Sequence, residues 1–288
     1  MKEKEVPKPR MGKRTNTVLT ILFSVISAVY ILPIVIVLVN SFKDRRMISS
    51  SPFSLPDADS FVGFENYLRG MGEGSYPFYR AVLYSVFITV ASTFVIVLCT
   101  SMCAWYISRN ASRLDRIFYT LCIVSMVVPF QTVMYTLPQT ANMLGLGNPV
   151  GIVLIYLGFG AGLSVFMFSG FVKSIPAEIE EAATIDGCGP MRTFFSVVFP
   201  IMKPTVISVA ILELMWIWND YLLPYRVLDL NKYRTIPIQV QYLNSGYGLK
   251  DIGAMMAMVI ISILPIIIFY LFAQKSIVKG IVAGAVKG

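Results

Sequence analysis

Long apolar runs separated by short polar segments dominate the sequence. Each run is close to or longer than the roughly 20 residues that an α-helix needs to cross a bilayer. The runs cover approximately residues 18–39, 81–107, 117–137, 150–172, 205–223 and 252–273. The pattern therefore predicts an all-α, polytopic membrane protein with six transmembrane helices, and an even number places both termini on the same side of the membrane.

The composition supports a membrane location. Hydrophobic residues make up 56% of the chain and charged residues only 14%, whereas soluble domains carry about 25% charged residues. The pI near 9.3 does not indicate nucleic-acid binding, because the basic residues lie in loops and at the ends of apolar runs, where they report topology. We therefore expect membrane lipid, and no nucleic acid, as a partner.

The distribution of Lys and Arg gives the orientation. Fifteen of the 24 Lys and Arg residues lie in the N-terminal tail and in the segments on the same side of the membrane as the tail. The positive-inside rule then predicts a multi-pass protein of the cell membrane with both termini in the cytoplasm, including a cytoplasmic tail over residues 1–16. The first apolar run is longer than the core of a cleaved signal peptide, so we interpret it as an uncleaved span.

Several kinds of chemistry are missing from the sequence. The chain contains no histidine, the commonest general base and a frequent metal ligand. Its four cysteines form no CxxC pair, and neither GxxxxGK[ST] nor GxSxG occurs. We therefore expect no catalytic residue, no metal site, no cofactor and no enzymatic activity, and any ATP must be hydrolysed by a separate subunit.

A polar, helix-prone island lies between the fourth and fifth apolar runs, over residues 174–204. Ser174 is a candidate N-cap, glutamates crowd the first turns, and Gly187 is a natural C-terminal stop. At helical spacing, one face is mostly small and apolar: Ile175, Ile179, Ala182, Ala183 and Asp186. Taken alone, this pattern leaves open whether the helix lies on its own protein or presents a docking surface.

The spacing within this island resembles the EAA loop of the membrane subunits of ATP-binding-cassette (ABC) importers. The matching residues are Glu181, Ala182, Ala183, Asp186, Gly187 and Pro200. The resemblance implies a coupling helix that docks into a cleft of a cytoplasmic ATPase. The sequence departs from the pattern at Cys188-Gly189-Pro190, which leaves the shape of the second half of the loop open.

Further segments resemble the maltose-permease-like branch of these importers. They are Asn40-Ser41-Phe42-Lys43, Asn66-Tyr67, Trp218-Asn219-Asp220, Thr235-Ile236-Pro237 and, at the C-terminus, Gln274-Lys275, Gly280 and Gly284–Gly288. The resemblance covers residues 18–288. It implies the type I ABC importer transmembrane fold, with a transmembrane domain over residues 17–288 and a core at about 80–275.

The same resemblance implies the function and the partners. The chain would be the permease subunit of a sugar importer that works by alternating access. A second, related permease, usually forming a heterodimer, would share the translocation pathway. Two cytoplasmic ABC ATPase subunits would supply energy, and an extracytoplasmic solute-binding protein would deliver the sugar.

Polar residues in the fifth apolar run are candidates for lining that pathway. Glu213 follows Pro204 by nine residues, which places it roughly 13 Å along the helix. Glu213, Trp216 and Asp220 share a helical face, and Asn219 lies beside them. A carboxylate with an aromatic ring suits a sugar path, and a structural role for Glu213 against a neighbouring helix is equally open. The alternative function is a secondary transporter or channel that uses Glu213 as its intramembrane carboxylate.

Overall fold

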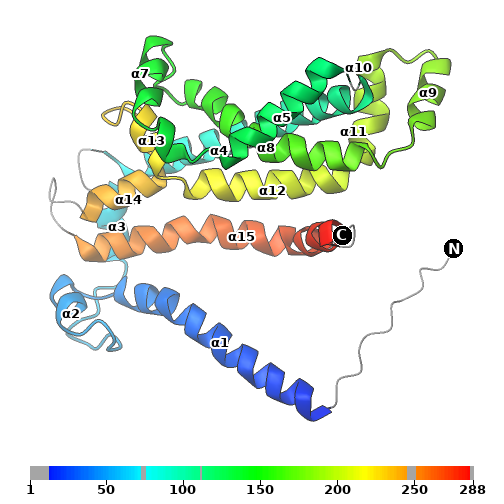
Figure 1. Ribbon diagram of the computed structural model, residues 1–288. Helices are drawn as coiled ribbons and strands as arrows, with labels where there is room; N and C mark the ends of the chain where they lie inside the picture. The colour runs from blue at the N-terminus through cyan, green and yellow to red at the C-terminus, as the bar shows by residue number, and fades with distance from the viewer. Residues whose placement is uncertain (1–12, 73–75, 111, 245–250, 286–288) are drawn as a thin grey trace. The chain divides into compact units, whose positions relative to one another are not determined.

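A computed structural model describes residues 13–72, 76–110, 112–244 and 251–285 of the chain. The described helices are, in order, α1 (Lys13–Asn40), α2 (Arg45–Ser50), α3 (Glu65–Gly72), α4 (Phe78–Asn110), α5 (Arg113–Val127), α6 (Phe130–Val133), α7 (Thr136–Met143), α8 (Gly151–Val172), α9 (Ala177–Ile185), α10 (Pro190–Thr193), the π-helix η1 (Phe194–Val198), α11 (Phe199–Ile201), α12 (Lys203–Asn219), α13 (Leu222–Val227), α14 (Ile236–Asn244) and α15 (Ile252–Ala285) (Figure 1).

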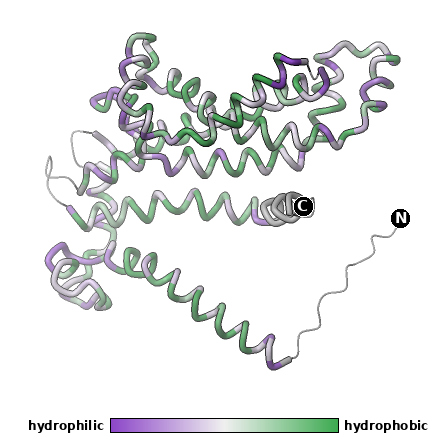
Figure 2. The backbone as a smooth tube through the Cα atoms, viewed as in Figure 1, coloured by the Kyte–Doolittle hydropathy of each residue, from purple (hydrophilic) through white to green (hydrophobic). Residues whose placement is uncertain are grey.

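The structure confirms an all-helical chain with several long apolar helices. Over the described residues the β-structure is limited to one bridge, between Lys43 and Phe61. Figure 2 shows apolar residues running along α1, α4, α8 and α15, and more polar residues around α9. Residues 13–16, expected in the cytoplasmic tail, form the first turn of α1, and the rest of that tail lies outside the described residues. The side chains of the C-terminal segments used for the resemblance, beyond Gln274, also lie outside them.

The predicted count of six spans is not confirmed. Within the described residues, four helices are long and apolar enough to cross a membrane: α1, α4, α8 and α15. A fifth span results if residues 190–201 and α12, which meet at a bend of 79°, are counted together. The remaining expected span is the third apolar run along the chain, residues 117–137. It is divided among α5, α6 and α7.

The division of this span has a local cause. Val128 precedes Pro129, and a residue before proline is disfavoured in the α-helical conformation. Val128 accordingly has φ −73° and ψ 114°, which ends α5 after 15 residues. The hydrophobicity of the run continues past this point, so a prediction from hydrophobicity alone joined segments that the backbone separates.

The chain forms two compact units. The first comprises the described residues up to Gly70 together with 251–260, and the second comprises 71–250 with 261–285, except the gaps given above.

The second unit is built around α8, which packs against α4, α5 and α12 (Figure 1). Glycine allows the close approach of these helices: a Cβ at Gly162 would lie 2.7 Å from the Cys122 carbonyl oxygen of α5. Two apolar clusters fill the interface, one around Phe168 and Phe194 and the other around Ile152 and Tyr156. This packing fixes α12, the helix that carries the candidate pathway residues.

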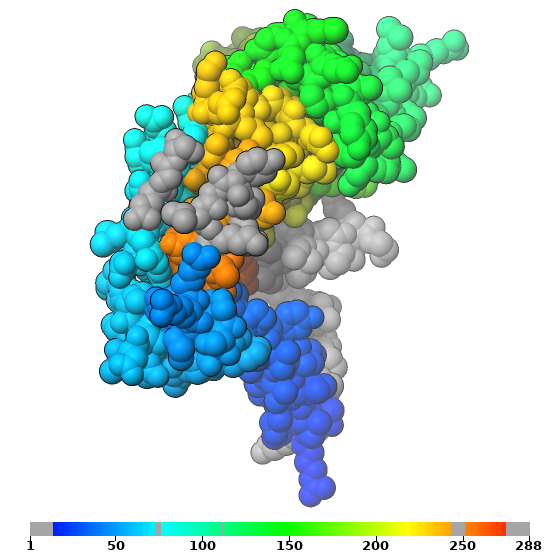
Figure 3. Space-filling model, turned by 90° about the vertical axis from the view of Figure 1, so that its left-hand side faces the viewer, coloured from blue at the N-terminus to red at the C-terminus, as the bar shows by residue number. Residues whose placement is uncertain are grey.

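In the first unit, α1 has no buried residue over its apolar window. Figure 3 shows α1 extending from the cluster of atoms formed by the loop that follows it. A helix that is apolar on all sides and uncovered by its own unit is suited to lipid or to another transmembrane helix.

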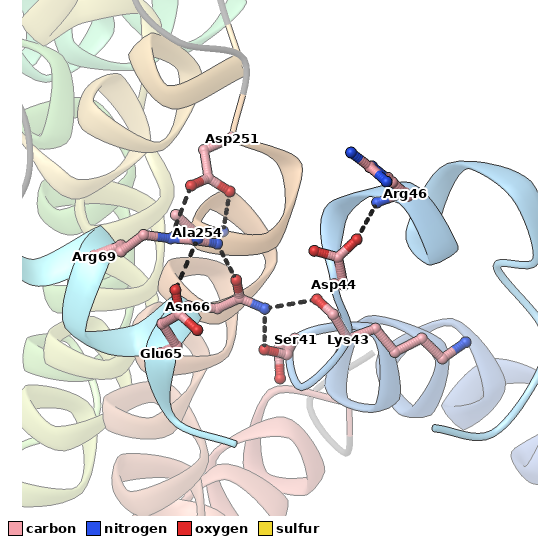
Figure 4. Close-up of polar contacts among 9 residues, drawn as sticks. All are labelled: Ser41, Lys43, Asp44, Arg46, Glu65, Asn66, Arg69, Asp251 and Ala254. Atoms are coloured by element: carbon pink, nitrogen blue, oxygen red, sulfur yellow. Dashed lines mark hydrogen bonds and ion pairs between the residues drawn. The ribbon is translucent and has the colours of Figure 1, made fainter. Parts of the chain in front are cut away.

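Asn66 organises the loop after α1. Its amide nitrogen donates to the carbonyl oxygens of Ser41 at 2.8 Å and Lys43 at 2.9 Å, and its amide oxygen accepts from Arg69 (Figure 4). Arg69 also pairs with Asp251 at 3.2 Å, and Asp251 accepts from the backbone N–H of Ala254 at the start of α15. The segments quoted for the resemblance around Asn40 and Asn66 are thus one folded structure.

We predict that Asn66→Leu destabilises this loop. Asn66 is fully buried, and the substitution leaves two buried carbonyl oxygens without a donor, each costing about 1–3 kcal/mol. Thermal unfolding of the purified protein in detergent should begin several degrees lower than in the wild type. Asn231→Leu is the matched control, because Asn231 is exposed; an equal loss in both variants would contradict the role of Asn66.

Candidate functional site

The polar island forms the helix α9 between two sharp turns. Pro176 precedes the helix with φ −58° and ψ 135°, without a side-chain cap. The expectation that Ser174 caps α9 is wrong, because its hydroxyl donates back to the Phe171 carbonyl oxygen at 2.6 Å. The expected stop at Gly187 is confirmed: Gly187 has φ +79° and follows the C-cap Asp186, a conformation that glycine adopts without strain.

The two faces of α9 differ in what they contact. Ala183 is 7% exposed and faces the protein, as does the half-buried Glu180, whereas Ile185 is 86% exposed. The side away from the protein carries two acids and two apolar residues: Glu178, Glu181, Ala182 and Ile185. The expected single apolar face is therefore divided, with Ile175 and Ala183 buried and Ile179, Ala182 and Asp186 exposed.

Pro200 lies at the other end of the loop. It is an exposed residue at the start of α11, directly before the 79° bend into α12. The π-helix η1 precedes α11 and places Phe194 and Val198 in the core. The coupling candidates thus occupy one loop: Glu181, Ala182 and Asp186 are exposed on it, Ala183 faces inward, and Gly187 and Pro200 shape its turns.

Glu180 is the residue of this loop that the sequence analysis missed. Its carboxylate accepts hydrogen bonds from the indole of Trp105 at 2.9 Å and from the guanidinium of Arg109 at 2.6 and 2.9 Å. Both donors lie on α4, one helical turn apart. Arg109 also donates to the Ile175 carbonyl oxygen at 2.9 Å. Glu180 therefore joins α9 to the end of a membrane span.

Glu213 lies inside the helix bundle rather than on its surface. It is 2% exposed, one turn from Val209 of one apolar cluster and one turn from Ile217 of the other. Its Oε1 accepts from the Ser164 hydroxyl of α8 at 3.0 Å, and among the described residues its Oε2 has no hydrogen-bond partner. A polar group buried in a membrane protein packs against helices that can bond it, and here α8 does so.

We predict that Gly160→Ala disturbs this contact. A Cβ at Gly160 would lie 2.8 Å from Cδ1 of Ile96 and 2.9 Å from Oε2 of Glu213, so these buried side chains, or the helices that carry them, must shift. Overpacking of this kind costs about 1–3 kcal/mol. Gly158→Ala in the same helix is the control, because its Cβ would meet nothing within 4 Å. Thermal unfolding should fall for the first variant only; equal unfolding temperatures would contradict the packing.

The other pathway candidates surround the end of α12. Trp216 and Asn219 are exposed, on a face that also includes Leu212 and Met215. Asp220 is half-buried, accepts from the Tyr156 hydroxyl at 2.9 Å, and accepts from the backbone N–H of Leu222 at 2.9 Å.

Tyr156, which the sequence analysis did not select, connects these candidates. Its ring packs edge-on against Trp216 at 5.4 Å between centroids. The structure therefore groups Trp216 and Asp220 around Tyr156, and places Glu213 in the helix interface instead.

Comparison with known proteins identifies the class. Residues 96–282 match the family model described as "Binding-protein-dependent transport system inner membrane component". The chain is 38% identical over 269 residues to "Probable starch degradation products transport system permease protein AmyC" of Thermoanaerobacterium thermosulfurigenes, covering 93% of this chain and 96% of that protein. It is 33% identical over 271 residues to "Multiple sugar-binding transport system permease protein MsmG" of Streptococcus mutans serotype c, covering 93% and 95%.

A solved structure shares the fold. A chain of a bacterial ABC transporter involved in the import of the acidic polysaccharide alginate matches with a TM-score of 0.78 at 21% identity, over 93% of this chain and 99% of that one. The comparisons confirm the predicted fold and transport class: a multi-pass permease component of an ABC importer, rather than an enzyme. The chain belongs to the family of binding-protein-dependent transport system inner membrane components.

Proposed function

We propose that this chain is the permease subunit of an ATP-driven sugar importer and that α9 is the helix on which the ATPase acts. The observation that carries the proposal is the outward face of α9, where the apolar Ile185 and Ala182 are exposed between the acids Glu178 and Glu181. In the described part of the chain these two acids form no ion pair. Such a face suits a cleft with an apolar floor and basic edges.

Sugar is the proposed substrate class because of the relatives. The printed names of two of them refer to starch degradation products and to multiple sugars. The exposed Trp216 and Asn219 support the assignment, since an aromatic ring and an amide are suited to sugar C–H faces and hydroxyl groups. Glu213 and Asp220 would support this face from inside the helix bundle, through their hydrogen bonds with Ser164 and Tyr156.

The exposed apolar surfaces of the chain support the remaining proposed partners. The face of α12 around Leu212 and Met215 and most of the apolar length of α1 are exposed within their units, which supports a second permease that forms the other half of the pathway. Two ATPase subunits would engage one α9-type helix each, and an extracytoplasmic solute-binding protein would load the pathway. The excess of basic residues on one side supports cytoplasmic termini.

Uptake into proteoliposomes tests this function against the secondary-transport alternative. The chain is reconstituted with its partner permease, ATPase subunits and solute-binding protein, and a panel of labelled sugars is supplied outside. We expect accumulation that requires ATP inside and persists when the membrane is permeable to protons. Accumulation driven by a proton gradient without ATP would contradict the proposal and favour a proton-linked role for Glu213.

A further inference from the structure

The contact between Glu180 and α4 is stronger than an ordinary surface ion pair. Exposed pairs contribute little to stability, because water screens them and two side chains must be held in place. Here the side chains of Arg109 and Glu180 are only 24% and 13% exposed. Both carboxylate oxygens are used, one by the guanidinium and one by the indole, and a forked, charge-assisted contact of this kind also fixes the relative orientation of its partners.

The same contact ties together further parts of the loop. The ring of Trp105 packs against Phe194 of η1 at 5.4 Å between centroids. Arg109 donates a hydrogen bond to the carbonyl oxygen of Ile175, which lies in the turn that connects α8 to α9. Four elements therefore meet at this point: α4, α9, η1 and the turn after α8. We call Trp105, Arg109 and Glu180 the α4–α9 joint.

A cavity adjoins the C-terminal half of α9. This cavity of about 540 Å³ lies beside the joint, bounded by Trp105, Arg109 and Glu180 together with Thr184, Ile185, Cys188 and Thr193. Thr184 and Ile185 of α9 line it on one side, and Pro190 and Thr193 of α10 line it on the other. A movement of α9 toward α10 would narrow this cavity, and the joint is the contact that links such a movement to α4.

We propose that Glu180 is the positioning residue that transmits movement of α9 to α4. This inference rests on the proposed function, in which an ATPase moves α9. With the joint intact, α9 and the cytoplasmic end of α4 move as one body, so α8 and α12, which pack against α4, follow. Without the joint, α9 follows the ATPase while α4 remains in place, and ATP is hydrolysed without transport.

A double-mutant cycle in the reconstituted transporter tests the proposal. The variants are Glu180→Gln, Arg109→Gln and the two combined, with Arg116→Gln as the control, because Arg116 is an exposed arginine of α5 that forms no ion pair among the described residues. Three quantities are measured for each: the affinity of the ATPase for the permease, the rate of ATP hydrolysis, and the sugar molecules transported per ATP. Thermal unfolding in detergent monitors folding.

We expect each single variant to transport at least tenfold less sugar per ATP, with ATPase affinity and hydrolysis close to wild type. The combined variant should lose less than the product of the two single losses, because both remove the contact between Glu180 and Arg109. Arg116→Gln should behave as wild type. The proposal would be overturned if Glu180→Gln transported as much sugar per ATP as the wild type, or if the losses of the two single variants added in the combined variant. It would also be overturned if the loss of transport per ATP only paralleled a fall in the unfolding temperature. Failure of the wild-type permease to bind the ATPase would instead overturn the proposed function.

Discussion

A Gly187→Pro variant is expected to reach the membrane and lose ATP-driven uptake more than a hundredfold. Gly187 has φ +79°, and proline fixes φ near −65°. The change also removes the N–H that bonds the Thr184 carbonyl oxygen at 3.0 Å, and it disfavours the conformation of Asp186, which has φ −72° and ψ 7°. Because a misplaced proline costs about 3 kcal/mol or more, the turn that ends α9 cannot form and its outward face is no longer presented.

The measurement is uptake of a transported sugar in cells or proteoliposomes that contain equal amounts of each permease. Gly189→Ala provides the control, since Gly189 has φ −71° and a Cβ there meets nothing within 4 Å. It should transport at the wild-type rate. Wild-type uptake by Gly187→Pro would show that the shape of this turn is not needed for coupling.

Ile185→Asp is expected to weaken binding of the ATPase at least tenfold. Ile185 is the most exposed large apolar side chain of α9, and a central apolar anchor of an interface contributes about 2 kcal/mol or more. The aspartate also adds a third acid near Glu178 and Glu181, and it must be desolvated if the interface closes over it. The affinity can be measured between the purified permease pair in nanodiscs and the isolated ATPase.

The permease itself should not be affected by this change. Because Ile185 makes little contact with its own chain, Ile185→Asp should unfold at the wild-type temperature, and Ile185→Leu should keep both stability and affinity. Unchanged affinity in Ile185→Asp would place the ATPase contact elsewhere. A parallel fall in unfolding temperature would mean that the residue stabilises the permease.

Features determined by neighbouring residues were predictable from the sequence. The apolar runs gave α1, α4, α8 and the start of α15, because a helix in lipid needs a long apolar segment. Gly187 was identified as the end of α9 because few other residues adopt positive φ. The polar island between the fourth and fifth runs was expected to be helical, and α9 to α11 lie there.

Features that depend on distant partners were not predictable. Glu180 bonds Arg109 and Trp105, which precede it by 71 and 75 residues, so no local pattern distinguishes it from Glu178 or Glu181. Tyr156 and Asp220 are separated by 64 residues. Helical spacing likewise grouped Ala182 with Ala183, although only the fold determines that the first is exposed and the second buried.

Cross-linking from α9 would reveal which face of this helix contacts the ATPase. In a permease whose Cys99, Cys103, Cys122 and Cys188 are replaced by serine, a single Ala182→Cys or Ala183→Cys change is introduced and the assembled transporter is treated with a short bifunctional reagent. Because Ala182 is exposed and Ala183 is 7% exposed, we expect Ala182→Cys to capture the ATPase subunit efficiently and Ala183→Cys to capture little. Absence of any ATPase product from Ala182→Cys, in a complex that still transports sugar, would contradict the claim that this face of α9 receives the ATPase.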